Sequence, residues 1–198
     1  YRRLLVTVPV SDGDAYVVDL FRTRGGRTHD WLLHGDADRD MTAECNVALQ
    51  PREGSMLEPG EQWDEPRDEQ SRFNACGAIR EVKEGQTESE VQVRFSYPDD
   101  PGRGLRLHIL GGAPTQVFLG QSPSVRRSKN DPAHAFDFWM PQLILRRQGP
   151  DTLTSLFAAV EEPYAGRPFL TGVQPLAVTP ADPQVAALFS GGLDGGQW

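Results

Sequence analysis

Two neighbouring stretches, Val91-Gln-Val-Arg-Phe-Ser-Tyr97 and Gly104-Leu-Arg-Leu-His-Ile-Leu110, decide the fold class of this 198-residue chain. Apolar residues stand at positions 91, 93 and 95 and again at 105, 107 and 109, with polar residues between them. The link Asp99-Asp-Pro-Gly102 has the composition of a turn. Because side chains alternate between the two faces of a strand, the pattern predicts an antiparallel hairpin with one apolar and one polar face.

The rest of the chain repeats this pattern of short apolar segments between turn residues. Residues 15–34 are interpreted as a second hairpin, with a turn at Gly25-Gly26. Asp182-Pro183, followed by apolar residues, favours one short helix over 182–189. Further strands are predicted at 4–8, 45–49, 78–83, 115–119, 143–147, 156–160 and 169–178. We therefore expect an all-β fold, an antiparallel β-sandwich or a large folded sheet, with at most one short helix.

Length and charge narrow the class of protein. A chain of 21.9 kDa is long enough for one complete core, so residues 1–198 are predicted to form a single domain. The net charge of −8 disfavours a general nucleic-acid binder. No apolar run reaches 18 residues, so no membrane contact is expected. The chain has no initiator Met and opens directly on an apolar stretch, which predicts a piece cut from inside a longer protein.

Two long segments are predicted to be loops. Residues 51–72 are rich in proline and acidic residues and form an expected solvated insertion. Residues 121–141 combine basic with aromatic residues, and a long ordered loop of this kind is often functional.

The candidate substrate-binding residues are basic or aromatic. Arginine forks suit carboxylate or sulfate groups, and aromatic rings suit the faces of sugars. For the candidates on the polar face of the first hairpin, the alternative to substrate binding is an ordinary solvated face with partners such as Glu90. For the candidates in the 121–141 loop, the alternative to substrate binding is that the loop packs against its own aromatic residues. The six candidates are Arg94, Arg106, His108, Arg126, Arg127 and Trp139.

Metal and catalytic motifs are weak. His29 and His34 are expected on opposite faces of one strand, so with Asp30 they are interpreted as structural or supporting residues. The segment Asp36–Asp40 begins like a calcium loop but lacks the required Gly and Glu, which favours a polar turn. Cys45 and Cys76 allow either one disulfide or two buried thiols. No catalytic residue and no metal ligand are assigned in this chain.

Several stretches, in order, resemble the heparinase II/III-like polysaccharide lyases, especially Tyr16 to Gly35 with its WLLHG ending. The other stretches are 104–111, 117–123, 141–147 and 156–164. The resemblance implies the C-terminal β-sheet region of an enzyme that cleaves uronate-containing polysaccharides by β-elimination. It also implies an upstream α/α toroid and an upstream sheet that carry the main catalytic residues and a zinc site.

For this chain, the resemblance implies a scaffold that contributes a wall of the substrate cleft, without a cofactor of its own. The implied partners are an anionic polysaccharide and the upstream domains, and the implied location is secreted or periplasmic. A non-catalytic carbohydrate-binding β-sandwich is the alternative, and a third hypothesis is an interaction module packed on the toroid.

Overall fold

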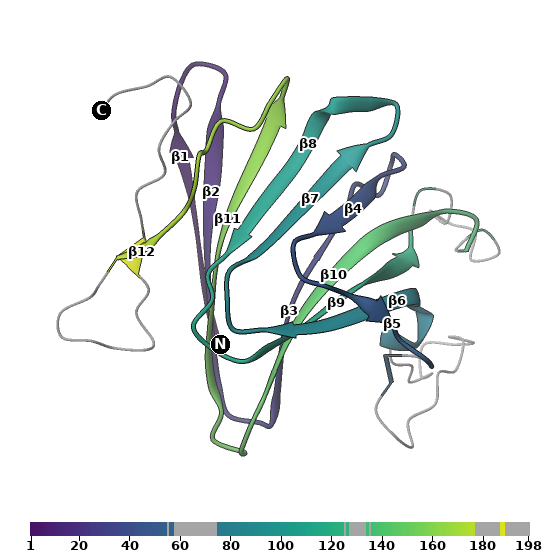
Figure 1. Cartoon of the computed structure of the whole chain (residues 1–198), viewed down its shortest axis with the longest axis vertical. Coiled ribbons are helices and arrows are strands. Elements are labelled where there is room, and N and C mark those ends of the chain that lie inside the picture. Colours follow the sequence, from purple (N-terminus) through teal and green to yellow (C-terminus); the bar gives the residue numbers. More distant parts are fainter. Residues whose placement is uncertain are drawn as a thin grey trace.

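The computed structural model describes residues 1–54, 56–57, 75–124, 126, 134, 136–176 and 187–188, and it is built almost entirely from antiparallel strands (Figure 1). The six-stranded sheet contains, in spatial order, β1 (Arg2–Pro9), β2 (Ala15–Arg24), β11 (Thr154–Ala165), β8 (Asp100–Ile109), β7 (Val91–Tyr97) and β4 (Thr42–Cys45). The five-stranded sheet contains β3 (Thr28–His34), β10 (Trp139–Gln148), β9 (Thr115–Pro123), β6 (Arg80–Thr87) and β5 (Gln50–Pro51). A short 3-10 turn, η1 (Ala75–Ala78), and the pair β12 (Pro175–Leu176) and β13 (Ala187–Leu188) complete the described elements. The predicted all-β sandwich is confirmed.

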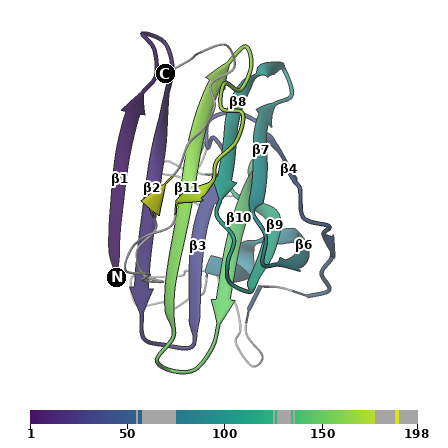
Figure 2. The same ribbon diagram turned by 60° about the vertical axis from the view of Figure 1, so that its left-hand side comes forward.

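The main core lies between the two large sheets, which Figure 2 shows one behind the other. Phe95 and Leu107 enter it from the six-stranded sheet, and Leu143 and Leu145 enter it from β10 of the five-stranded sheet. Trp31 of β3 closes the same cluster. Burial of these apolar side chains between two sheets is the main force that holds the layers together.

The hairpin predicted from the opening stretches is confirmed. β7 and β8 pair antiparallel, with Val93 opposite Leu107 and Arg94 opposite Arg106. The turn comes earlier than predicted, because β8 already begins at Asp100 and the register shifts between Ser96 and Tyr97. The paired positions change from Ser96 opposite Gly104 to Tyr97 opposite Asp100, so the pairing is irregular at the end of the hairpin.

The predicted hairpin over 15–34 is wrong. β2 pairs with β1 and β11, whereas β3 pairs with β10, so the chain passes from one sheet to the other between them. Gly25 and Gly26 both have positive φ angles, 85° and 86°, which glycine adopts without a steric cost. Their amides donate to the carbonyl groups of Leu153 and Asp151, each at 2.8 Å. The β2–β3 and β10–β11 connections therefore cross between the sheets side by side.

Several other strand limits need correction. The strand expected at 45–49 ends at Cys45, and the strand expected at 78–83 begins at Arg80, after η1. Of the strand expected at 169–178, only Pro175–Leu176 is a strand among the described residues. These errors share a cause, since a short apolar run also suits a segment that packs on a sheet without pairing.

The remaining predictions concern loops and the expected helix. The loop 121–141 is shorter than predicted, because β9 continues to Pro123 and β10 begins at Trp139. The acidic insertion lies mostly outside the described residues, and so does the helix expected at 182–189, of which Ala187–Leu188 are in β13. Neither Cys45 nor Cys76 takes part in a disulfide. Within the described residues, no helix has the length and apolar character needed to cross a membrane.

Candidate functional site

Two of the predicted binding residues, Arg106 and His108, belong to a buried charge cluster on the outer face of the six-stranded sheet. At its centre is Glu162 of β11, which is fully buried and lies 2.6 Å from Arg106 Nε. His108 is also buried, and its Nδ1 lies 2.9 Å from a carboxylate oxygen of Glu90. Glu90, the partner expected for the solvated-face alternative, is therefore present, although His108 itself is buried.

The chain after β11 covers part of this face. Figure 2 shows it crossing the outer face of the sheet on its way to β12. The amides of Phe169 and Leu170 donate to Glu162 Oε1 at 2.5 and 2.6 Å, and Arg106 donates to the Leu170 carbonyl. Leu170 and Val173 pack with Val160 beside this cluster. The carboxylate of Glu162 thus holds the segment at Phe169 and Leu170 against the sheet through hydrogen bonds.

The surroundings of Glu162 set its charge. Burial by itself would raise the pKa of Glu162, because it disfavours the charged form. The side chains of His108 and Arg106, together with the amide of Leu170, outweigh this effect and hold the pKa of Glu162 below its usual range. His108 Nε2 lies 3.9 Å from Glu162 Oε2, which is too far for a hydrogen bond.

Arg94, the third predicted residue of this face, is also engaged within the chain. Its Nε donates to the hydroxyl of Tyr164 at 2.9 Å, and its guanidinium lies 5.6 Å from the centre of the Tyr164 ring. A second donor reaches the carbonyl of Pro101 at 3.3 Å. The pairing of β7 with β8 brings Arg94 opposite Arg106 on the face predicted to be polar, but both arginines are held by neighbouring groups of the chain itself.

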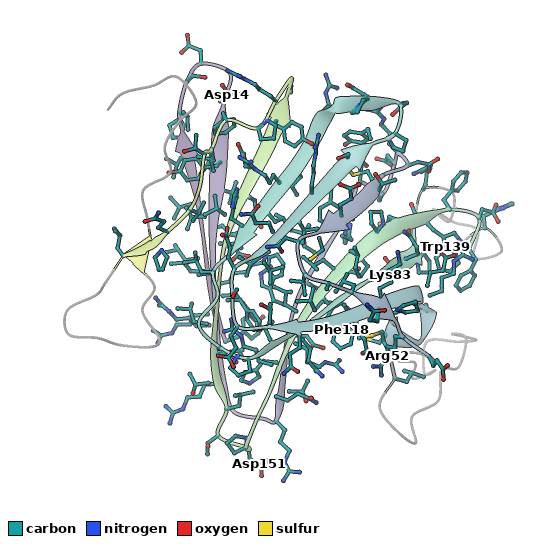
Figure 3. The ribbon with its side chains drawn as sticks, viewed as in Figure 1. Asp14, Arg52, Lys83, Phe118, Trp139 and Asp151 are labelled. Atoms are coloured by element: carbon teal, nitrogen blue, oxygen red, sulfur yellow. The ribbon has the colours of Figure 1, made fainter. Side chains whose placement is uncertain are left out.

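Arg126 and Trp139, the predicted residues of the 121–141 loop, lie on the five-stranded sheet side of the molecule. Arg126 donates to Asp40 Oδ1 at 2.9 Å and lies 4.7 Å from the ring centre of Phe138. The guanidinium of Arg80 lies 3.4 Å from the ring centre of Trp139. Figure 3 shows Trp139 far from Asp151, which lies at the bottom of the view. Trp139 Nε1 donates to the Phe136 carbonyl at 3.0 Å. These contacts are those of a loop packed on its own aromatic residues. Arg127, the remaining candidate of this loop, lies outside the described residues.

His29, Asp30 and His34 occupy β3, and their contacts are structural. His29 is buried between the Ser155 hydroxyl, 2.9 Å from Nδ1, and the Gly25 carbonyl, 2.8 Å from Nε2. Asp30 accepts two hydrogen bonds from Arg146 across the β3–β10 pair, at 2.9 and 2.8 Å. His34 is exposed at the end of the strand, where it borders the pocket described below. The prediction that the two histidines do not form a joint site agrees with this geometry.

The inner face of β2 holds a charged group that the sequence analysis missed. Asp19 is fully buried and accepts hydrogen bonds from Arg3 Nε at 3.0 Å and from Arg3 Nη2 at 2.7 Å. The indole of Trp31 donates to the same carboxylate at 2.9 Å, from the opposite sheet. Asp19 interrupts the apolar run 16–21, and a charged residue within a predicted buried strand was the available signal.

Glu161 of β11 is the second carboxyl on this inner face. It lies opposite Val17 in the β2–β11 pair, one diagonal step from Asp19, which lies opposite Ala159. Burial raises the pKa of Glu161, and the negative charge of Asp19 raises it further, while Arg3 acts in the opposite direction. We call Arg3, Asp19 and Glu161 the inner-edge cluster.

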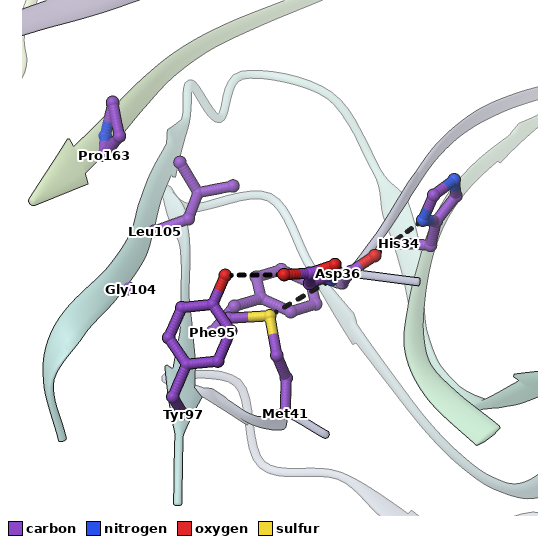
Figure 4. Close-up of a pocket in the computed structure, with 9 residues that line it drawn as sticks. His34, Asp36, Met41, Phe95, Tyr97, Gly104, Leu105 and Pro163 are labelled. Atoms are coloured by element: carbon purple, nitrogen blue, oxygen red, sulfur yellow. Dashed lines mark hydrogen bonds between the residues drawn. The ribbon is translucent and has the colours of Figure 1, made fainter. Parts of the chain in front are cut away.

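A pocket of about 250 Å³ opens near this cluster, at the rim between the two sheets (Figure 4). We call it the rim pocket. Its polar centre is the Asp36 carboxylate, to which the Tyr97 hydroxyl donates at 2.9 Å. The remaining lining combines apolar side chains with backbone, and Pro163 places it on the same face of β11 as Glu161. The lining residues are His34, Gly35, Asp36, Met41, Phe95, Tyr97, Gly104, Leu105 and Pro163.

The chemistry of the rim pocket follows from Asp36 and Tyr97. The amide of Asp38 donates to Asp36 at 2.8 Å and, with the Tyr97 hydroxyl, lowers the pKa of Asp36. Burial and the hydrogen bond to Asp36 raise the pKa of Tyr97. The phenol therefore stays protonated at neutral pH and the carboxylate stays charged, so the pair offers hydrogen bonds to a polar ligand.

Asp36, the first residue of the segment 36–40 that was predicted to be a polar turn, lines the rim pocket. Within the described part of the chain, no three His, Cys, Asp or Glu side chains gather as a metal would require. Tyr97 and Asp36 are 61 positions apart in the sequence, so only the fold brings them together.

Comparison with known proteins adds no family assignment: the chain matches no protein-family model and no curated protein sequence. The resemblance to heparinase II/III-like lyases therefore stays a prediction from the quoted stretches.

Proposed function

We propose that this chain is the C-terminal β-sandwich of a heparinase II/III-like polysaccharide lyase and that its rim pocket forms part of the substrate-cleft wall. The observation that carries the proposal is the composition of that pocket. The charged oxygen atoms of Asp36 and the hydroxyl of Tyr97 lie beside the apolar surfaces of Leu105 and Pro163. A few directed polar groups on an apolar lining are typical of small-ligand pockets, and they suit the alternating polar edges and apolar faces of a sugar ring.

The pKa of Tyr97 favours a binding role over proton abstraction. A tyrosine that removes a proton in β-elimination needs a pKa near the working pH, hence below its ordinary value. The pKa of Tyr97 is shifted upward, because of burial and the hydrogen bond to Asp36. The proposal therefore assigns elimination, and any zinc, to upstream domains of the complete enzyme, and assigns support and sugar contact to this chain.

The alternative, a free-standing carbohydrate-binding sandwich, rests on Trp139 and the arginines of the predicted sites. Arg80 stacks on the Trp139 ring, and Arg94, Arg106 and Arg126 are hydrogen-bonded within the chain. These contacts favour the rim pocket over the loop as the sugar site.

Titration of the 198-residue chain with uronate oligosaccharides, derived from heparin and from alginate, tests the proposal by NMR. We expect shifts in the resonances of residues around Asp36 and Tyr97, at millimolar sugar. Tyr97→Phe is expected to weaken binding several-fold, because it removes one hydrogen-bonding hydroxyl. The control is Tyr164→Phe, which removes a hydroxyl from the outer face and is expected to leave sugar binding unchanged.

Three results would contradict the proposal. The first is no binding of any uronate oligosaccharide at millimolar concentration, and the second is equal binding by the wild type and Tyr97→Phe. The third is the release of unsaturated uronate, detected by its ultraviolet absorbance, by this chain alone, which would show that the chain carries the catalytic residues itself.

A further inference from the structure

Strand β1 forms an edge of the six-stranded sheet (Figure 1). It exposes a run of apolar residues. Leu5 remains 57% exposed, Leu4 55% and Val6 41%. Among the described residues, the backbone of β1 pairs only with β2, through the eight positions Arg2–Pro9. Within the part of the chain that the structure describes, one side of its backbone is thus available for hydrogen bonds to another strand.

The sequence of β1 does little to block such pairing. Edge strands are commonly protected by a bulge, by a central proline or by charged side chains directed into the path of a partner. β1 pairs with β2 in unbroken register, and its proline, Pro9, stands at the last position. The charge of Arg3 is already neutralised by Asp19, to which it donates two hydrogen bonds.

The β1 sequence is also complementary to itself in antiparallel pairing. With Leu5 opposite Leu5 of a second copy, Leu4 lies opposite Val6 and Arg3 lies opposite Thr7. Residues directly opposite share one face of a sheet, so Leu4 and Val6 of both copies form one continuous apolar stripe on the outer face. The same register places no arginine opposite another arginine.

We propose that β1 is an interaction surface for a second copy of this chain, which joins two six-stranded sheets edge to edge through antiparallel β1–β1 pairing centred on Leu5. The two-fold axis is perpendicular to the sheet and keeps both five-stranded sheets on the same side. The arrangement leaves room for them, because β3 reaches β2 through the Trp31–Asp19 hydrogen bond and β1 is one strand further out. A contact through one strand is small, so the dimer belongs to the weak class of interface.

Analytical ultracentrifugation of the 198-residue chain over a range of micromolar to millimolar concentrations measures the association. We expect a reversible monomer–dimer equilibrium. Leu5→Lys places two charges directly opposite each other in the dimer and is expected to weaken association at least tenfold. Leu32→Lys is the matched control: Leu32 is 47% exposed on β3, the edge strand of the other sheet, and its substitution is expected to leave the equilibrium unchanged.

Cross-linking tests the register in a background that carries Cys45→Ala and Cys76→Ala. Directly opposite residues in an antiparallel pair have Cα atoms about 4.5 to 5.5 Å apart, within the range of a disulfide. Leu5→Cys is expected to give an oxidised dimer. A mixture of the Leu4→Cys and Val6→Cys chains is expected to give the mixed dimer in preference to either homodimer.

The proposal is overturned if the chain stays monomeric at every concentration, or if Leu5→Lys and Leu32→Lys have the same effect on association. Cross-linking of Leu32→Cys at the rate of Leu5→Cys would also overturn it. Circular dichroism of each variant, compared with that of the wild type, confirms that the fold is retained.

Discussion

Glu161 and Glu162 are adjacent in β11, yet the fold shifts their pKa values in opposite directions. Glu162 faces outward into the charge cluster, where Arg106 and backbone amides hold its pKa below the usual range. Glu161 faces inward, where burial and the neighbouring Asp19 raise its pKa. Glu162 is fully buried, whereas Glu161 is half-buried. The comparison teaches that the hydrogen-bond donors around a buried carboxylate, and not burial alone, decide whether it is charged.

The largest effect is expected from removing the charge of Glu162. Glu162→Gln leaves Arg106 without its buried partner and weakens the attachment of the segment at Phe169 and Leu170. We expect a loss of about 3 kcal/mol in the free energy of unfolding, as for other broken buried ion pairs. Urea denaturation measures it, and Glu161→Gln is the matched control on the other face of the same strand. A loss below that of the control would contradict the assigned role of Glu162.

A somewhat smaller loss is expected at the inner edge from Asp19→Asn. The amide retains one oxygen acceptor for Trp31 but cannot balance the charge of Arg3. The expected loss is about 2 kcal/mol, by the cost of leaving a buried polar group without its charged partner. Thermal unfolding measures this loss, and the indole Nε1–H resonance of Trp31 is expected to shift in the NMR spectrum. An unchanged Trp31 resonance would argue against the hydrogen bond across the sheets.

The pH dependence of stability separates the two glutamates further. Because the folded state lowers the pKa of Glu162, its stabilising contribution is complete above the unfolded-state value of about 4.3 and is lost as the pH falls through the folded-state value. The difference in unfolding free energy between wild type and Glu162→Gln should therefore shrink between pH 7 and strongly acidic pH. Denaturation curves at several pH values measure this difference, and a constant difference would contradict the lowered pKa.

The smallest effect is expected at Glu161, and it has the opposite sign. A raised pKa in the folded state means that ionisation of Glu161 destabilises the protein as the pH rises through that value. Glu161→Gln is thus expected to increase the free energy of unfolding at pH 7 by less than about 1 kcal/mol, since the group is partly exposed. Denaturation in urea detects this gain, which should disappear below the unfolded-state pKa. Destabilisation at neutral pH would show that the Glu161 carboxylate has a stabilising partner.

Local patterns predicted the parts of the fold that depend on neighbours in sequence. The alternation at 91–97 and 104–110 predicted the β7–β8 hairpin, because a tight turn brings those strands together. The same reasoning failed at 15–34, where two apolar strands are also separated by a glycine turn. There each strand pairs with a distant partner, β11 and β10, and no local signal distinguishes this arrangement from a hairpin.

The candidate site was less predictable than the fold. The alternation placed Arg94 and Arg106 on one polar face, but their partners Tyr164 and Glu162 come from another strand. The rim pocket was missed, because Asp36 and Tyr97 meet only after the end of β7 and the segment following β3 are brought together. A resemblance between strand patterns carries no information about such long-range contacts.

The sequence by itself determined the all-β class, the alternation of apolar and polar faces and the β7–β8 hairpin, since all three follow from local periodicity and turn chemistry. The tertiary structure decided which strands share a sheet, which arginines meet carboxylates and why two adjacent glutamates differ in pKa. These outcomes depend on contacts between residues far apart in the chain, where packing and desolvation act together and composition does not reveal the partner.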